Sequence, residues 1–201
     1  MNNREYLIHI LLKLKRTGIK DEKILKVVEK IPPHYYLNIF YDNSVIYKVD
    51  INEVVEIVKL LELSLHLNFK LENVLLLGFK NGWLLVLLTN FCKRIYGICD
   101  NISHKEKLEL FFFNNNYSNI YLSNGKNITA WNKVAPFDLI LCLNINSFSI
   151  IDIINLLSKS GIAIIPRFSK FNSIEIISIN KNNFVFKQNC DFNLLKKSNL
   201  I

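Results

Sequence analysis

Short apolar runs that alternate with helical patterns fill the second half of the chain, and this alternation constrains the fold more than any other feature. From residue 73 the apolar runs are "NVLLLG", "RIYGICD", "NIYLSNG", "FDLILCLNI" and "IAIIPRF". The segments that read as helices are "WLLVLLTNF", "KEKLELFFFNNN" and "IIDIINLLSKSG". Unbroken apolar runs are typical of strands buried on both faces. Strands that alternate with helices predict an α/β fold with a doubly wound, mostly parallel sheet.

The two ends of the chain add different elements to this sheet. The tail "SIEIISINKNNFVFKQN" alternates apolar and polar residues, which predicts an antiparallel hairpin with its turn at 181–183. Apolar stripes at helical spacing predict a helix over 4–16, a second between Asp21 and Pro32, and a third over 51–65. We therefore expect a Rossmann-like sheet with N-terminal helices and a C-terminal antiparallel hairpin.

Composition limits the classes of function. The 201 residues are half hydrophobic and suit one compact domain. The formal net charge is +8, but no basic run interleaves with aromatic side chains, so nucleic-acid binding is not favoured. The four cysteines form no C-x-x-C pair and no histidine stands at zinc-ligand spacing, so no metal site is expected. The apolar runs are too short for a membrane span, and we expect a monomeric cytoplasmic protein.

The stretch "NVLLLGFKNGW" is the strongest candidate for a ligand site. An apolar strand ends in Gly78, and Gly82 follows after three intervening residues. Doubly wound sheets bind ligands beyond the carboxyl ends of their strands, where the strand order reverses. A glycine turn at that place lets the backbone approach a ligand closely. The pattern therefore predicts a cofactor turn.

The order of several segments resembles the protein-L-isoaspartate O-methyltransferase family. Over residues 15–168 these segments are "GIKDEKILKVVEKIPPHYY", "VLLLGFKNGW", "RIYGICD", "NIYLSNGKNITAWNKVAPFDLILC" and "LLSKSGIAIIPRF". The resemblance implies S-adenosylmethionine as cofactor and methyl transfer to isoaspartyl carboxyls, which is a protein-repair reaction. It also implies an N-terminal helical segment with the acceptor-side loop over 1–70, and a methyltransferase core over 71–201.

The resemblance assigns roles to particular residues. Asn52 stands where the family has a catalytic serine. The positions that the family uses to bind the cofactor are Leu77, Gly78, Phe79, Gly82, Cys99, Asp100, Gly125, Lys126 and Asn127.

At several positions in and around these motifs, the resemblance implies a residue type that this chain does not have. Leu76 replaces a glutamate, Lys80 replaces the central glycine of the turn, and Lys126 replaces an aspartate. Cys99 stands where the second strand ends in an acid, with Asp100 one residue later. The amide of Asn52 can form hydrogen bonds but cannot shuttle a proton as a hydroxyl does.

These departures leave three functional hypotheses. The chain is a methyltransferase with weak or lost activity, or a non-catalytic binding or scaffold protein (a pseudoenzyme) on the same fold, or a barely functional descendant under relaxed selection. In each case the expected partner is a protein substrate or a protein partner. The enzyme hypothesis fails if the side chains of Phe79, Lys80 and Trp83 fill the cavity beside Gly78. Trp83 and Trp131 are expected to pack in the core or at its rim, and Asp138 to hold the start of a strand.

Overall fold

The computed structural model describes residues 3–33, 50–67, 71–79, 81–99, 101–125, 128–143, 148–168, 174–180 and 185–190. The helices are α1 (Asn3–Arg16), α2 (Glu22–Lys30), α4 (Ile51–Leu67), α5 (Trp83–Leu88), α6 (Ile102–Asn114), α7 (Ile150–Leu156) and the 3-10 helix η2 (Ile128–Trp131). The strands are β1 (Asn73–Leu77), β2 (Arg94–Cys99), β3 (Ile120–Asn124), β4 (Phe137–Cys142), β5 (Leu157–Phe168), β6 (Ile174–Asn180) and β7 (Val185–Cys190).

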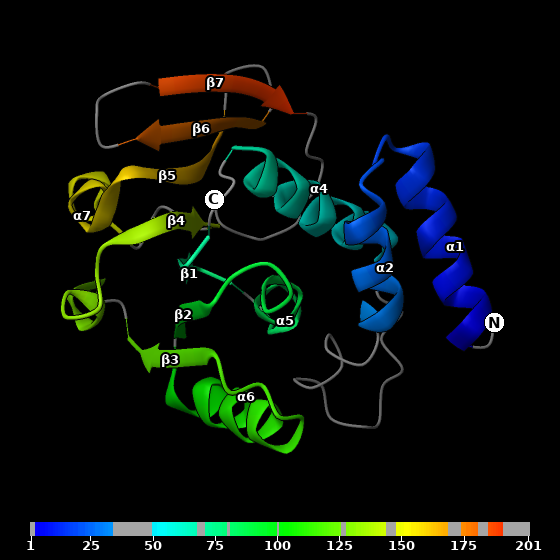
Figure 1. Ribbon diagram of the computed structural model, residues 1–201, viewed down its shortest axis with the longest axis horizontal. Coiled ribbons are helices and arrows are strands. Elements are labelled where there is room, and N and C mark those ends of the chain that lie inside the picture. Colours follow the sequence, from blue (N-terminus) through cyan, green and yellow to red (C-terminus); the bar gives the residue numbers. More distant parts are fainter. Residues whose placement is uncertain are drawn as a thin grey trace.

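The strands form one sheet in the order β3-β2-β1-β4-β5-β6-β7 (Figure 1). Neighbours from β3 to β5 pair in parallel, which confirms the predicted parallel sheet. β6 pairs antiparallel with β5 and with β7. The turn predicted at 181–183 lies outside the described residues.

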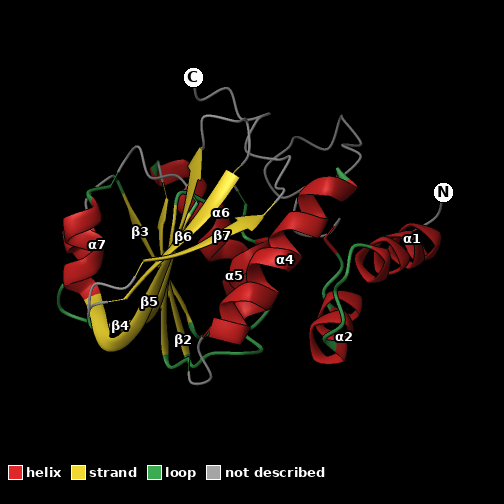
Figure 2. Ribbon diagram, turned by 90° about the horizontal axis from the view of Figure 1, so that it is seen from above, coloured by secondary structure: helices red, strands yellow, loops and turns green. Residues whose placement is uncertain are grey.

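Helices cover both faces of the parallel strands. α4 and α5 lie on one side of the sheet and α7 on the other (Figure 2). Because side chains alternate along a strand, Leu76 faces the larger layer and Leu75 and Leu77 face the smaller one. The larger layer also holds the buried residues of α1 and α2, so the N-terminal helices share one apolar core with the sheet.

The starts of α2 and α4 are stabilised by aspartates that directly precede them. The Asp21 carboxylate accepts hydrogen bonds from the N–H groups of Lys23 (2.8 Å) and Ile24 (3.2 Å) and caps α2, as predicted. The side chain of Asp50 accepts from the Asn52 N–H at 2.9 Å, just before α4. No helix in the described ranges is long and apolar enough to cross a membrane.

The segment after α7 differs from the prediction. The sequence predicts a helix that continues to Gly161, but α7 ends at Leu156 and β5 begins at once. Leu157 pairs with Phe137, and a Cβ on Gly161 would lie 2.5 Å from the Phe137 carbonyl oxygen. Gly161 therefore permits a close approach of two strands and does not terminate a helix.

Candidate functional site

The sheet reverses its order between β1 and β4. The chain passes from β1 to β2 and β3 on one side, then crosses to β4 and β5 on the other. The carboxyl ends of β1 and β4 are joined there, because the Leu143 N–H donates to the Leu77 carbonyl at 2.9 Å. The glycine turn follows β1 at this point, which is where doubly wound sheets bind their ligands.

Both glycines of the turn meet a structural requirement. Gly78 has a φ of 69°, in the left-handed region that glycine adopts without strain. A Cβ on Gly82 would lie 2.6 Å from Leu108 Cδ2 on α6. Between them, the side-chain oxygen of Asn81 accepts from the Trp83 N–H at 3.1 Å and starts α5. The described residues on either side of position 80 therefore each have a structural reason for their place in the turn.

Phe79 turns into the protein. Its side chain is only 4% exposed and lies over Gly97 of β2. A Cβ on Gly97 would approach both Phe79 Cε1 and Leu122 Cδ2 to 2.9 Å. The Phe79 ring centroid lies 6.2 Å from that of His104 on α6. Phe79 therefore fills the layer between the sheet and α6, and the absence of a side chain at Gly97 makes room for it.

Trp83 is also an interior residue. It is fully buried, and its indole N–H donates to the Ile31 carbonyl at 3.0 Å. This confirms that Trp83 packs in the core. Of the three bulky side chains at the turn, Phe79 and Trp83 thus belong to the helix-covered layer, and Lys80 lies outside the described residues.

The carboxyl ends of β2 and β3 are joined by a backbone hydrogen bond. The Gly125 N–H donates to the Cys99 carbonyl at 2.9 Å, and Gly125 has a φ of 99°. Leu76 and Cys99, which the resemblance aligns with acids of the family, are fully buried in the apolar layer. Neither side chain offers an oxygen to a ligand. Asp100, Lys126 and Asn127 lie outside the described residues.

The first turn of α4 lies against the glycine turn. Asn52, which the resemblance aligns with a serine of the family, is exposed there. Its neighbour Glu53 is half-buried, and Glu53 Oε1 accepts from the side-chain N–H of Asn81 at 3.5 Å. Nearby, burial and the negative charge of Asp50 raise the pKa of Tyr6 to about 12.

Sequence reasoning missed the contact between Asn81 and Glu53. An acid in the first turn of a helix, such as Glu53, is usually explained by the helix dipole alone. The order Asn-Gly-Trp after the first glycine was an available signal, because asparagine often bonds to the backbone N–H two residues on. Nothing in the sequence pairs Asn81 with a residue of the third helix.

Asp138 has a structural role at the opposite end of the sheet. Its carboxylate accepts from the N–H groups of Glu72 (2.9 Å) and Asn73 (3.1 Å) at the start of β1, and from the Ser158 hydroxyl (3.3 Å). This confirms that Asp138 holds the start of a strand. It is distant in the topology from the strand ends that carry the candidate site.

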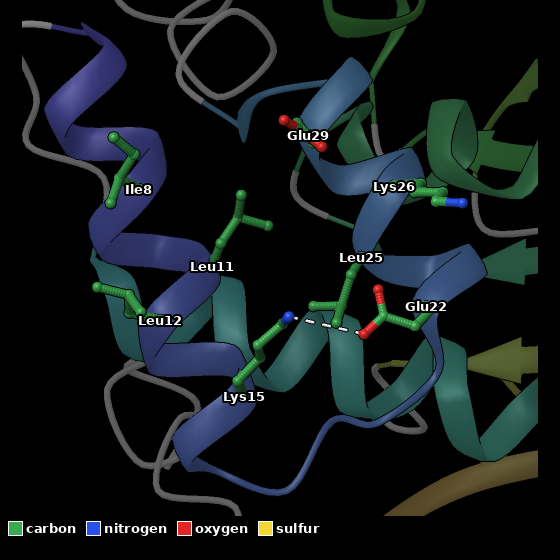
Figure 3. Close-up of a pocket in the computed structure, with 8 residues that line it drawn as sticks. All are labelled: Ile8, Leu11, Leu12, Lys15, Glu22, Leu25, Lys26 and Glu29. Atoms are coloured by element: carbon green, nitrogen blue, oxygen red, sulfur yellow. Dashed lines mark ion pairs between the residues drawn. The ribbon is translucent and has the colours of Figure 1, made fainter.

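A hollow of about 290 Å³ lies between α1 and α2 (Figure 3). Its lining residues are Ile8, Leu11, Leu12, Lys15, Glu22, Leu25, Lys26 and Glu29. Lys15 reaches across to Glu22, with 3.6 Å between Nζ and Oε1. The lining offers aliphatic side chains and two charges of each sign, with no nucleophile or histidine, so we place the candidate site at the strand ends instead.

Solved structures share this architecture. One protein-L-isoaspartate O-methyltransferase superposes with a TM-score of 0.68 at 16% identity, covering 92% of this chain and 63% of that chain. A Plasmodium falciparum protein assigned to the same activity, solved with S-adenosyl-L-homocysteine, gives a TM-score of 0.63 at 17% identity and covers 96% of both chains. The fold is that of the class I methyltransferases.

Sequence relatives narrow this class to a family. No family model matches the chain. A protein-L-isoaspartate O-methyltransferase of Dictyoglomus turgidum is 30% identical over 148 residues, which are 69% of this chain and 64% of the relative. Its counterpart in Dictyoglomus thermophilum is 29% identical over 153 residues, covering 70% of this chain and 65% of the relative. The chain is a divergent member of the protein-L-isoaspartate O-methyltransferase family. It spans just under two thirds of the length of these two relatives.

Proposed function

We propose that the chain binds S-adenosylmethionine at the carboxyl ends of β1, β2 and β3 and retains a weak or residual protein carboxyl methyltransferase activity towards isoaspartyl residues. The observation that carries this proposal is the glycine turn. Gly78 keeps the left-handed backbone of a cofactor turn, and the bulky Phe79 beside it is turned into the core. The backbone path at the end of β1 is therefore compatible with a ligand.

The proposed roles follow the strand ends. Leu77, Gly78, Phe79 and Gly82 offer the backbone of the turn to the amino-acid end of the cofactor. Cys99 and Asp100 lie towards its ribose, and Gly125, Lys126 and Asn127 towards its adenine. In the proposed division, residues 1–70 carry the acceptor side, where Asn52 hydrogen-bonds the substrate, and residues 71–201 form the core.

Weak activity follows from the same residues. Bound S-adenosylmethionine would supply an activated methyl group, so the protein's task is mainly to position two reactants. The apolar side chains at Leu76 and Cys99 offer no carboxylate to the cofactor. Each lost hydrogen bond to a charged acceptor costs about 1.5–3 kcal/mol, or roughly one to two decades of affinity. Asn52 also provides no hydroxyl for proton transfer.

A non-catalytic binding or scaffold protein is the second candidate. It is favoured because Leu76 and Cys99 replace acids while the apolar layers of the sheet remain complete. In both cases we propose a cytoplasmic monomer that acts on or binds protein rather than nucleic acid. The two candidates differ in whether any methyl group is transferred.

Calorimetry and a methyl-transfer assay test the proposal. The full chain is titrated with S-adenosylmethionine and then assayed with an isoaspartyl peptide and radiolabelled methyl donor. We expect binding in the high-micromolar to millimolar range and slow labelling of the isoaspartyl peptide but not of its aspartyl isomer. Binding without labelling supports the scaffold candidate. No heat at millimolar ligand overturns the cofactor assignment.

A further inference from the structure

The glycine turn touches a carboxylate that does not come from a strand end. Glu53 Oε1 lies 3.5 Å from the side-chain nitrogen of Asn81, the residue between Gly78 and Gly82 that starts α5. Glu53 belongs to the first turn of α4 and is half-buried. A charge in such a setting is less screened by water and salt than one on the open surface.

The orientation of the Asn81 amide is determined from both sides. Its oxygen accepts from the Trp83 N–H at 3.1 Å, so its NH₂ group must face Glu53. A glutamate carboxylate only accepts, and the two groups are therefore complementary. Glu53 is held beside the turn by a side chain of the turn itself, while Asp50 bonds to the backbone N–H of Asn52 in the same helical turn.

We propose that Glu53 is the carboxylate that recognises the cationic amino-acid end of S-adenosylmethionine, and that Asn81 is the residue that positions it. This inference rests on the proposed function. The turn meets the amino-acid end of the cofactor, and that end carries an ammonium group. Leu76, at the family's glutamate position, is fully buried in the apolar layer and cannot receive this group. Glu53 brings a carboxylate to the same turn from the helical side.

A ligand series tests which charge Glu53 meets. S-adenosylmethionine carries an ammonium and a sulfonium, S-adenosylhomocysteine only the ammonium, and methylthioadenosine neither. In calorimetry on the full chain, we expect Glu53→Gln to lower the affinity for the first two ligands by about tenfold or more, because the variant loses a charged hydrogen-bond partner. Methylthioadenosine should bind as it does to the wild type. Glu106→Gln, on the exposed side of α6, makes the same charge change and should alter none of the three affinities.

A swap variant keeps the test valid if Glu53→Gln does not fold. The pair Glu53→Gln with Asn81→Asp retains a donor opposite an acceptor, keeps an oxygen for the Trp83 N–H, and returns one negative charge to the same place. We expect it to bind S-adenosylhomocysteine more tightly than Glu53→Gln alone. A swap variant that binds this ligand no better contradicts the assignment.

The remaining outcomes separate this inference from the proposed function. If wild type and Glu53→Gln bind both amino-acid-bearing ligands equally, the role of Glu53 is overturned and cofactor binding stands. If the wild type binds none of the three ligands at millimolar concentration, both are overturned. Equal weakening of all three ligands by Glu53→Gln, with an unchanged melting temperature, also overturns the inference, because it shows no preference for the charged end.

Discussion

The indole nitrogen of Trp83 donates a hydrogen bond of 3.0 Å to the carbonyl oxygen of Ile31, and the contact is buried. It joins the first residue of α5 to the residue that follows α2. Because the glycine turn directly precedes α5, this hydrogen bond connects the end of α2 to the turn. A second hydrogen bond, from the Asn81 side chain to Glu53, connects α4 to the same turn. The N-terminal helices and the glycine turn are therefore held together by the side chains of Trp83 and Asn81.

The Trp83 contact should matter for stability. Trp83→Phe removes the donor to Ile31 and leaves space in the core, and we expect it to lower the free energy of unfolding by about 3 kcal/mol. The matched control is Trp131→Phe, because the indole nitrogen of Trp131 has no hydrogen-bond partner among the described residues. Its expected cost is under about 1 kcal/mol. Urea unfolding followed by circular dichroism measures both, and equal losses would contradict the role given to the Trp83 bond.

Gly78 should be needed by the ligand as well as by the fold. Gly78→Ala puts a side chain on a backbone with a φ of 69°, which costs about 1–2 kcal/mol. Gly18→Ala is the control, because Gly18 has a φ of 97° and a Cβ added there would meet nothing within 4 Å. Both variants should lose a similar free energy of unfolding. Only Gly78→Ala should lower the affinity for S-adenosylmethionine measured by calorimetry. Equal affinities in the two variants would remove Gly78 from the proposed site.

Phe79 and Gly97 should behave as a complementary pair. Gly97→Ala places a Cβ 2.9 Å from Phe79 Cε1 and from Leu122 Cδ2, and such overpacking costs about 1–3 kcal/mol. Adding Phe79→Leu should restore part of the loss, and a double-mutant cycle in urea measures the coupling. Gly161→Ala should cost more than Gly97→Ala, because the obstacle 2.5 Å away is the backbone oxygen of Phe137. Additive effects of the Phe79 and Gly97 changes would show that the two residues are not in contact.

The thiol of Cys92 should make stability fall at high pH. Burial raises the pKa of Cys92 from 9.0 to about 12, and its sulfur donates to the Leu88 carbonyl at 3.0 Å. Above pH 9.0 the unfolded chain loses this proton before the folded chain does, so the unfolded state binds fewer protons. The stabilisation is therefore complete below that pH and is lost as the pH rises towards 12.

Urea unfolding at a series of alkaline pH values measures this effect. Cys92→Ala should show a shallower fall than the wild type. Tyr6→Phe should also flatten the curve at higher pH, because the pKa of Tyr6 is raised from 10.0 to about 12. Identical slopes for the wild type and Cys92→Ala would contradict the buried, protonated thiol. Resistance of native Cys92 to alkylation at neutral pH is a second expected result.

The sequence predicted helices and strands correctly where the repeat of apolar residues matches the residues that are buried. The run "NVLLL" is buried along nearly its whole length in β1, as expected of a strand between two helical layers. Asp21 caps α2 because capping depends on residues two and three positions away. The helix after β4 was predicted too long, because Gly161 is a common helix terminator and its close contact with Phe137 cannot be seen in sequence.

The place of the glycine turn was predictable from the sequence, but its side-chain contacts were not. Gly78 and Gly125 directly follow strands, and Gly82 directly precedes α5. The sequence could place this turn because turns after parallel strands have local signatures. The direction of Phe79 was not predictable, since the space that receives its ring is made by Gly97 on the next strand. The same holds for Asn81, whose partner Glu53 is 28 residues away.

The sequence by itself determined the order of strands and helices, the parallel sheet and the place of the glycine turn. Each of these features depends on residues that are close together in the sequence. The apolar repeats of strands and helices and the glycines of left-handed turns extend over only a few positions. Only the tertiary structure decided which way the side chains of the turn point and which carboxylate lies beside it. Those outcomes depend on the space left between layers, and that space is created by residues far apart in the chain.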